Sequence, residues 1–542
     1  MAPSLLLTIP SLLFLTAAYI YYRLIPVPLP GIPYSPSALR PLGEVRALKA
    51  YGKVSKEPSA AMFTITKALV SPIAQVLFTS FGRPMVLVDD AREAEDILVR
   101  RTREFDRSPL TTQFFHPLLP RCTLAQLTTP ALRAQKRLWG DVMGFEFLRR
   151  VVAPNVHTAA GELVELWRAR VDENGEKPFE VKKDFESAAL DAIWVAILGS
   201  KLGVLRRKIE KETAAREGSA TGSVTKGPGL SEGEEADTAI SSATIIQHAV
   251  EYMNKIVEAG FTSAWPAWGY FWLQLSPKYR RFKKITENEM RRLMVEACER
   301  FQHLNHDGDA DTKTDGEALE TCAMDFVLRR EVDRAQKAGL PAQDPAKDPA
   351  LLQELLLLLI AILDTDVPYL DAFIEETLRA AATAAITARI AVVDTEILGC
   401  RIPAGTNVLL NTRVLEKPSH TVDEDMRSPT SRTAQTKRAR GGLDGESGLN
   451  LDVFEPRRWL VKDEAHEGKE VFDKNALPSL VFGGGLRGCF GKRLAMQELR
   501  IIIVLLILAF EFQPLPQELA GLEAEEKLFR APIKAHVKLR AI

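Results

Sequence analysis

Apolar residues along this chain are grouped mostly in spacings and runs that favour helices. The pattern is mostly helical over Lys49–Gln302, and Met85–Val88 is a short apolar run that predicts a strand. Leu351–Leu363 is apolar almost all round and predicts a buried helix, while Val367–Ala382 predicts the next one. Lys492–Phe510 is strongly apolar and lacks Pro and Gly, so it predicts a long helix. The chain is therefore expected to be mainly α with small β-sheets.

Turn-forming and polar stretches predict the connections between these elements. Thr395–Cys400 and Asn407–Asn411 have the composition of strands, and the turn residues of Arg401–Gly405 predict that they form a hairpin. Lys201–Thr238 is rich in charge, Gly and Ser, which predicts a long surface loop. Ser428–Asn450 is of low complexity and also predicts a loop.

The N-terminal stretch Ser4–Tyr22 is apolar and uncharged, and it is long enough to span a bilayer. A cleaved signal peptide is the alternative, but no basic residue precedes the run and no small-x-small cleavage site ends it. Basic residues follow the span, so the positive-inside rule predicts that the rest of the chain is cytoplasmic. We therefore expect a membrane anchor at 1–23, a proline-rich hinge at 24–48 and one domain at 49–542.

Charge and cysteine content narrow the functional class. The 542 residues carry a net charge of -1, so composition gives no electrostatic argument for nucleic-acid binding. The cysteines are odd in number, far apart and without a Cys-x-x-Cys pair, which favours a reducing compartment and argues against a disulfide scaffold or a zinc site. They are Cys122, Cys298, Cys322, Cys400 and Cys489.

One cysteine has the setting of a metal ligand. Cys489 lies in the glycine-rich stretch Phe482–Gly491, directly before the helix predicted from Lys492. A helix N-terminus favours the thiolate form, and glycines allow φ > 0 turns and close approach of the backbone to a flat cofactor. Arg487 can pair with a cofactor carboxylate. The alternative is a buried cysteine beside a glycine-rich turn.

The pattern Phe-x-x-Gly-x-Arg-x-Cys-x-Gly in this stretch resembles the haem-thiolate signature of the cytochrome P450 family. The resemblance implies the cytochrome P450 fold with an N-terminal transmembrane helix, and haem b as cofactor. It implies that Cys489 is the axial ligand of the haem iron. It also implies that Phe482, Arg487 and Gly491 contact the cofactor.

Two further segments match the family in the same order. Glu376 and Arg379 form a Glu-x-x-Arg pair on one face of the helix predicted over Val367–Ala382. In the family such a pair is completed by an arginine from a later Pro-x-Arg segment, which here is Arg458. Arg389 stands where the family often has an arginine that binds a haem carboxylate, although a solvated strand end is equally consistent with its position.

The oxygen-activating stretch is the poorest match. Asp364 and Thr365 are the nearest counterparts of the family's acid-alcohol pair, but Ile362 stands at the glycine position, and a simple helix C-terminus is the alternative. Thr365 is also close in sequence to Glu376, whereas several tens of residues separate these motifs in the family. We interpret this as an internal deletion around 362–370, either natural or produced by a mispredicted intron.

The resemblance implies a membrane-anchored haem-thiolate monooxygenase that inserts one oxygen atom from O2 into a lipophilic organic substrate. Electrons would come from NADPH through NADPH-cytochrome P450 reductase, for which Arg457, Lys492 and Arg493 are candidate contacts. The expected location is the endoplasmic reticulum membrane, with the catalytic domain facing the cytoplasm. Two alternatives stay open: a haem-thiolate dehydratase or isomerase, and a non-catalytic haem-binding remnant.

Overall fold

The computed structural model describes most of the chain and divides it into two compact units. Unit 1 comprises Met1–Gln113, Asp366–Cys489 and Glu523–Ile533, and unit 2 comprises Phe114–Thr365, Phe490–Leu522 and Lys534–Ile542. The description leaves out residues 1–2, 81–82, 141, 143, 221–244, 246–247, 250–251, 254, 258, 261–265, 307–321, 339–367, 416–420, 437–449, 464–468 and 528.

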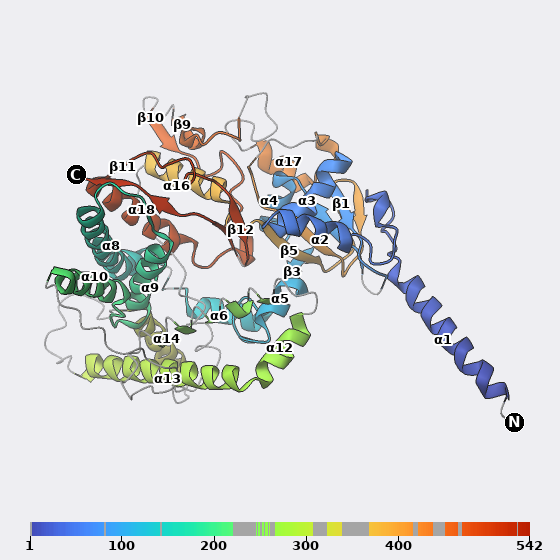
Figure 1. The fold of residues 1–542 in the computed structure, drawn as a ribbon, viewed down its shortest axis with the longest axis horizontal. Coiled ribbons are helices and arrows are strands. Elements are labelled where there is room, and N and C mark those ends of the chain that lie inside the picture. The colour runs from blue at the N-terminus through green and yellow to red at the C-terminus, as the bar shows by residue number, and fades with distance from the viewer. Residues whose placement is uncertain are drawn as a thin grey trace. The chain divides into compact units, whose positions relative to one another are not determined.

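Unit 1 contains most of the β-structure (Figure 1). Its helices are α1 (Pro3–Leu24), α2 (Val45–Val54), α3 (Pro58–Leu69), α4 (Ala91–Val99), the first five residues of α5 (Pro109–Phe115), α16 (Pro368–Ala381) and α17 (Pro429–Thr436). Its 3-10 turns are η1 (Pro36–Ala38), η5 (Glu424–Met426), η7 (Pro456–Trp459) and η9 (Gly485–Arg487). Its strands are β1 (Ile73–Val76), β2 (Met85–Val88), β3 (Phe105–Arg107), β5 (Ile386–Ala391), β6 (Thr395–Ile397), β7 (Cys400–Ile402), β8 (Asn407–Asn411), β9 (Leu460–Asp463), β10 (Lys469–Phe472), β12 (Ala524–Glu526) and β13 (Arg530–Pro532).

A five-stranded sheet in the order β1-β2-β8-β5-β3 organises this unit. Its strands pair antiparallel except for β2 and β8, which are parallel. Alternate residues of a strand point to opposite faces, so Val86 packs with one apolar cluster and Leu87 with another. Ile97 of α4 belongs to the first cluster and Phe63 of α3 to the second. The two helices therefore cover opposite faces of the sheet.

Unit 2 is mainly helical (Figure 1). Its helices are α6 (Pro130–Leu138), α7 (Phe145–Phe147), the π-helix η3 (Leu148–Val152), α8 (Ala153–Asn174), α9 (Lys182–Leu198), α10 (Val204–Ala220), α12 (Pro266–Leu275), α13 (Pro277–His306), α14 (Ala323–Ala338) and α18 (Lys492–Ala509). Its short strands are β4 (Phe179–Glu180), β11 (Phe510–Phe512), β14 (His536–Val537) and β15 (Leu539–Ala541). Trp167 and Trp194 are among its fully buried side chains, and α8 packs against α9, α10 and α18.

The loop predicted over Lys201–Thr238 is wrong in its first half, because residues 204–220 form α10. The charged residues that suggested a loop are good helix formers, and Leu205 and Ile209 lie four residues apart and are buried. Asp191 also accepts hydrogen bonds from the amides of Val204 and Leu205, both at 2.8 Å, which satisfies the first turn of the helix. The low-complexity loop expected from Ser428 is likewise interrupted by α17.

The predicted hairpin between Thr395–Cys400 and Asn407–Asn411 is also wrong, because these two segments do not pair with each other. Residues 395–400 do not form one strand: Leu398 and Gly399 take φ values of 47° and 74°, so the chain turns between β6 and β7, which pair with each other. Asn407–Asn411 instead joins the five-stranded sheet as β8. A leucine at positive φ carries no local sequence signal of a turn, since glycine or asparagine usually occupies such positions.

The transmembrane helix predicted for residues 1–23 is not found. In the part of the chain whose side chains are described, no helix combines the length and hydropathy required to cross a bilayer.

Candidate active site

The glycine-rich loop holds Cys489 at the end of a tight set of backbone hydrogen bonds. The amide of Gly483 donates to the Leu480 carbonyl at 2.8 Å, and the amide of Cys489 donates to the Phe482 carbonyl at 2.7 Å. Cys489 forms no disulfide, and its side chain is exposed. The helix α18 begins at Lys492, as the sequence predicted. The loop therefore presents a thiol at a position fixed by the backbone.

Glycine is required in this loop because the backbone packs closely on the end of α4. Gly485 has φ +60°, and a Cβ there would lie 2.7 Å from the Leu98 carbonyl oxygen. At Gly484 a Cβ would lie 2.5 Å from Cγ2 of Val99. Gly491, by contrast, has φ -82° and is the N-cap residue of α18, so its backbone conformation does not itself need glycine.

The loop is also tied to the helix that carries the Glu-x-x-Arg pair. Ser479, three residues before Phe482, donates from Oγ to Oε2 of Glu375 at 2.8 Å. Glu375 lies on α16 next to Glu376 and is buried. This contact was missed from the sequence, which offers no motif for it.

A cluster of arginines lies beside the loop residue Arg487. Strand β3 pairs antiparallel with β5, and the register places Arg107 directly opposite Arg389. The Arg487 guanidinium is 3.2 Å from Asp106 through Nη2 and 3.3 Å through Nε. Arg389 is only 5% exposed. Burial, followed by the charges of Arg107 and Arg487, lowers the pKa of Arg389 to about 9, and Asp106 only partly opposes this.

This cluster has the chemistry of a site for an anion. An arginine keeps its proton in proteins, so the lowered pKa of Arg389 expresses an energetic cost of the buried positive charge. A ligand that brings carboxylates to the cluster offsets that cost through charge-assisted hydrogen bonds. Together with the exposed thiol of Cys489, these residues fit a haem: the thiol suits the iron, and the arginines suit the carboxylates.

The predicted charge triad of Glu376, Arg379 and Arg458 is assembled in unit 1. Arg379 binds both carboxylate oxygens of Glu376, with Nε at 2.9 Å and Nη2 at 2.8 Å. Arg458 donates from Nε to the same carboxylate at 3.1 Å, and Trp459 donates from Nε1 at 3.0 Å. The amide of Glu455 adds a fifth donor at 2.9 Å. All three members of the triad are buried.

The surroundings of Glu376 favour its charged form. Burial alone would raise its pKa, but the hydrogen bonds from Arg379, the Glu455 amide and Trp459 outweigh burial, and the pKa lies below its usual range. The arginines are satisfied in turn, since Arg379 also donates to the Val414 carbonyl at 2.6 Å. The triad is therefore a fully paired buried network that fixes α16 to the η7 turn.

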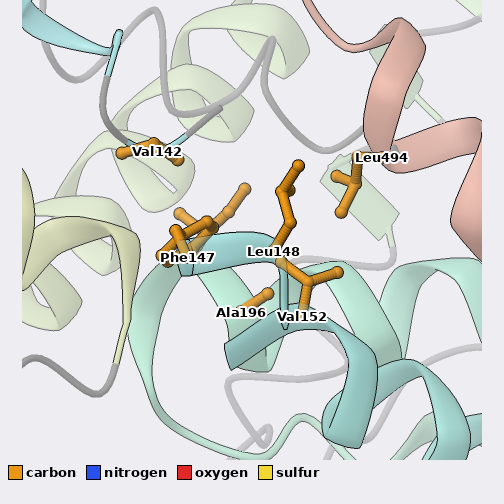
Figure 2. Close-up of a pocket in the computed structure, with 7 residues that line it drawn as sticks. Val142, Phe147, Leu148, Val152, Ala196 and Leu494 are labelled. Atoms are coloured by element: carbon orange, nitrogen blue, oxygen red, sulfur yellow. The ribbon is translucent and has the colours of Figure 1, made fainter. Parts of the chain in front are cut away.

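Unit 2 contains a small apolar pocket (Figure 2). Its walls come from the π-helix η3, α9, α18 and the residues before η3, and they carry no titratable side chain. The pocket can hold only a small apolar group, so it supplies none of the chemistry expected of the site. The lining residues are Val142, Phe147, Leu148, Val152, Ala196, Ile197 and Leu494.

The outcome for the other candidate residues is mixed. Phe482 contributes its carbonyl to the loop, as described above. Asp364 and Thr365 lie outside the described residues, so the acid-alcohol pair stays a prediction. Asp106 and Arg107 were not predicted as neighbours of Arg487 and Arg389, because these contacts depend on the pairing of β3 with a strand far away in the sequence.

Comparisons with known proteins place these motifs in one family. A sequence model of the family described as Cytochrome P450 matches residues 364–419 and 450–539, which include the triad, Arg389 and the cysteine loop. The chain is 30% identical to cytochrome P450 monooxygenase xilC of Penicillium rubens, over 97% of this chain and 95% of that protein. It is 28% identical to cytochrome P450 monooxygenase TRI13 of Fusarium sporotrichioides, over 98% of both chains.

These alignments are longer than the chain itself. The alignment with xilC of Penicillium rubens extends over 587 positions and that with TRI13 over 604, whereas the chain has 542 residues. Both relatives therefore have stretches with no counterpart in this chain.

The fold agrees with the sequence comparisons. A crystal structure of a cytochrome P450 (CYP102L1) superposes with a TM-score of 0.61 at 14% identity, covering 95% of this chain and 100% of that chain. The prediction of a mainly helical cytochrome P450 fold with small sheets is thus confirmed. The chain belongs to the cytochrome P450 family of haem-dependent oxidoreductases.

Proposed function

We propose that this protein is a haem-thiolate monooxygenase that inserts one oxygen atom from O2 into a lipophilic organic substrate. The observation that carries the proposal is the exposed thiol of Cys489. A hydrogen bond from the Cys489 amide to the Phe482 carbonyl fixes the position of this residue. The loop also packs so closely on α4 that a side chain at Gly485 would displace the α4 backbone. The relatives xilC and TRI13 are named monooxygenases, which supports the reaction class.

Each part of the site has a separate task in this proposal. Cys489 holds the iron of haem b, while Arg389 and Arg487 bind its carboxylates. The triad around Glu376 keeps α16 in place, and the Ser479–Glu375 hydrogen bond connects α16 to the start of the loop. The cofactor supplies the oxygen chemistry when it is bound.

Proton delivery is assigned to the residues that precede α16 in the sequence. Asp364 and Thr365 are proposed to hold the proton path, with Thr365 Oγ1 as the group that donates. The relatives xilC and TRI13 have residues with no counterpart in this chain. We also propose that some of these residues belong to the stretch before Glu376, because Thr365 and Glu376 lie close together in this sequence. Sequencing the transcript tests this: a message that encodes the junction as written excludes a gene-model error and leaves a natural deletion.

Electrons are proposed to come from NADPH through NADPH-cytochrome P450 reductase. Arg457 and Arg493 are exposed, and Lys492 is partly exposed, so all three are accessible to an acidic partner. Reversal of all three charges is expected to slow reductase-driven turnover at low salt more than at high salt. Unchanged turnover at low salt rejects these contacts.

We further propose that the protein is located at the endoplasmic reticulum membrane with its catalytic domain in the cytoplasm. The domain organisation of the proposal is an anchor at 1–23, a hinge at 24–48 and the haem domain at 49–542. The support is α1, where residues 11–22 are exposed and mostly apolar. Fractionation before and after carbonate washing tests it, and full release of the protein into the supernatant contradicts it.

Turnover with 18O2 tests the reaction directly. The purified holoprotein, the reductase and NADPH are incubated with a lipophilic substrate panel, and 18O in a product together with NADPH consumption is the expected result. The Cys489→Ala variant is the control. Conversion without reductase would indicate a dehydratase or isomerase, and haem binding without any turnover would indicate a non-catalytic remnant.

A further inference from the structure

Helix α4 connects a buried polar network to the loop that holds Cys489. The last residues of the helix pack closely on Gly484 and Gly485. A Cβ at Gly485 would lie 2.7 Å from the carbonyl oxygen of Leu98, which belongs to α4. The helix and the loop up to Cys489 are both part of unit 1. A shift of α4 therefore moves the backbone that positions the thiol.

The other end of α4 is held by buried ion pairs to the segment that leads into α17. Arg427 donates to both carboxylate oxygens of Asp90, the N-cap residue of α4, at 2.7 and 2.8 Å. Arg92 pairs with Glu424 at 2.6 Å. Asp96 accepts from two hydroxyl groups around the start of α17, at 2.5 and 2.8 Å. These contacts fix the position of the helix relative to the rest of unit 1.

Glu93 is the member of this network with the weakest pairing. Its side chain is 0% exposed, and Oε1 accepts from Nη1 of Arg101 at 2.9 Å. Among the described residues Oε2 has no hydrogen-bond partner. Arg101 is shared, because it also binds the Glu104 carboxylate at 2.7 Å and the Thr395 hydroxyl at 2.9 Å. Glu93 therefore combines complete burial with one shared cation and one unsatisfied oxygen.

This setting favours the neutral form of Glu93. Burial raises its pKa to about 7, and the nearby carboxylates of Asp90 and Asp96 act in the same direction. The charges of Arg101 and Arg427 oppose the shift, but both arginines also bind other carboxylates. Ionised Glu93 is therefore costly while α4 is in place, and the cost falls when the side chain reaches water.

We propose that Glu93 is a positioning residue for Cys489. In its neutral form Glu93 keeps α4 packed against the cysteine loop, and its ionisation releases α4 and the loop together in one local opening. The consequence for iron ligation rests on the proposed function. The coupling between Glu93 and the loop does not, since it depends only on contacts within unit 1.

Proton linkage gives the sign of the effect. The stabilisation that neutral Glu93 provides is fully present below about pH 4.5 and is lost as the pH rises through about 7. If the loop opens together with α4, its opening must become more frequent over the same range. If the two move separately, the titration of Glu93 leaves the loop unaffected.

Hydrogen exchange of the full-length protein, measured by mass spectrometry, tests this coupling without reference to haem. The amides of Gly483 and Cys489 are the probes, because both donate to carbonyls within the loop. Their protection, corrected for the intrinsic exchange rate at each pH, is expected to fall at least about tenfold between about pH 5 and 7.5, since one pKa unit corresponds to a factor of ten. Glu93→Gln imitates the neutral acid and should abolish most of this fall.

Glu44→Gln is the matched control. Glu44 is also buried in unit 1, and burial raises its pKa to about 7, but its carboxylate accepts from the amide of Leu77 at 3.3 Å, directly after β1. This variant should leave the pH dependence of loop protection as in the parent. Equal suppression by both variants, or an unchanged fall in Glu93→Gln, overturns the proposal.

The carbon-monoxide difference spectrum gives a second readout. At about pH 7.5 the thiolate-type band is expected to persist at least about threefold longer in Glu93→Gln than in the parent, and at about pH 5 equally long. A parent that binds haem without the band but shows the expected exchange refutes iron ligation by Cys489 and supports the coupling. A parent that has the band but whose loop exchange ignores Glu93 refutes the coupling and supports the proposed function.

Discussion

Arg107 lies directly opposite Arg389 in the antiparallel pair of β3 and β5, although both side chains are positively charged. Like charges in directly opposed positions destabilise a sheet. Arg487 adds a third guanidinium, and Asp106 offsets only part of the charge around Arg389. The cluster is therefore unfavourable in the protein alone, and the carboxylates of a bound cofactor are expected to offset that cost.

The first prediction concerns this cluster. Arg389→Gln is expected to leave the melting temperature of the apoprotein unchanged or higher, because it removes a buried charge that faces two others. The same change is expected to speed haem loss by roughly tenfold or more, since a charge-assisted hydrogen bond contributes about 1.5–3 kcal/mol. Haem transfer to excess apomyoglobin measures the rate. A lower apoprotein melting temperature with unchanged haem loss would assign Arg389 a purely structural role.

The second prediction concerns the buried triad. Glu376→Gln leaves Arg379 and Arg458 without a balancing charge, and breaking a buried ion pair in this way costs about 3–5 kcal/mol. Denaturant unfolding measures the loss. Glu296→Gln is the matched control, because this exposed residue also pairs with an arginine, Arg292, and should change stability by less than about 1 kcal/mol. Similar losses in the two variants would show that the triad is not a stabilising network.

The third prediction is a pH dependence set by Glu498 on α18. The side chain is partly exposed as a whole, but burial of its carboxylate raises the pKa from 4.5 to about 7. The stabilisation that Glu498 provides in its neutral form is therefore fully present below about pH 4.5 and is lost as the pH rises through about 7. Glu498→Gln should raise the melting temperature above pH 7 and lose that advantage at pH 4.5. The exposed Glu518→Gln variant is the control, and a gain that does not vary with pH would contradict the assignment.

The fourth prediction tests why the cysteine loop contains glycines. Gly484→Ala is expected to destabilise the protein because its Cβ would lie 2.5 Å from Cγ2 of Val99, and Val99→Ala should restore stability by removing that atom. Gly485→Ala should not be rescued in this way, since its neighbour is the Leu98 backbone and its φ is +60°. Melting temperatures of the single and double variants measure the coupling. Rescue of both variants by Val99→Ala would mean that the contacts have been misassigned.

Local sequence signals predicted the parts of the site that depend on short stretches. The start of α18 at Lys492 and the extent of α16 follow from apolar runs bounded by Gly491 and Pro368. Glu376 and Arg379 could be paired from helical spacing alone, and the structure confirms the pair. Such features are predictable because one element contains all the interacting residues.

Features that depend on distant pairing could not be predicted. Arg107 and Arg389 become neighbours only because β3 joins the edge of a sheet whose other strands come from two widely separated stretches. Ser479 and Glu375 are likewise brought together by packing. In α10, by contrast, the buried residues Leu205 and Ile209 already had helical spacing. A loop was predicted there because most of the neighbouring residues are charged.

The carbon-monoxide difference spectrum of the reduced, purified protein tests the central claim most directly. A thiolate ligand from Cys489 predicts a thiolate-type band in the parent protein. The Cys489→Ala variant, compared at equal haem content, should lack that band. A parent protein that binds haem without the band, or a variant that retains it, would contradict the assignment of Cys489 as the iron ligand.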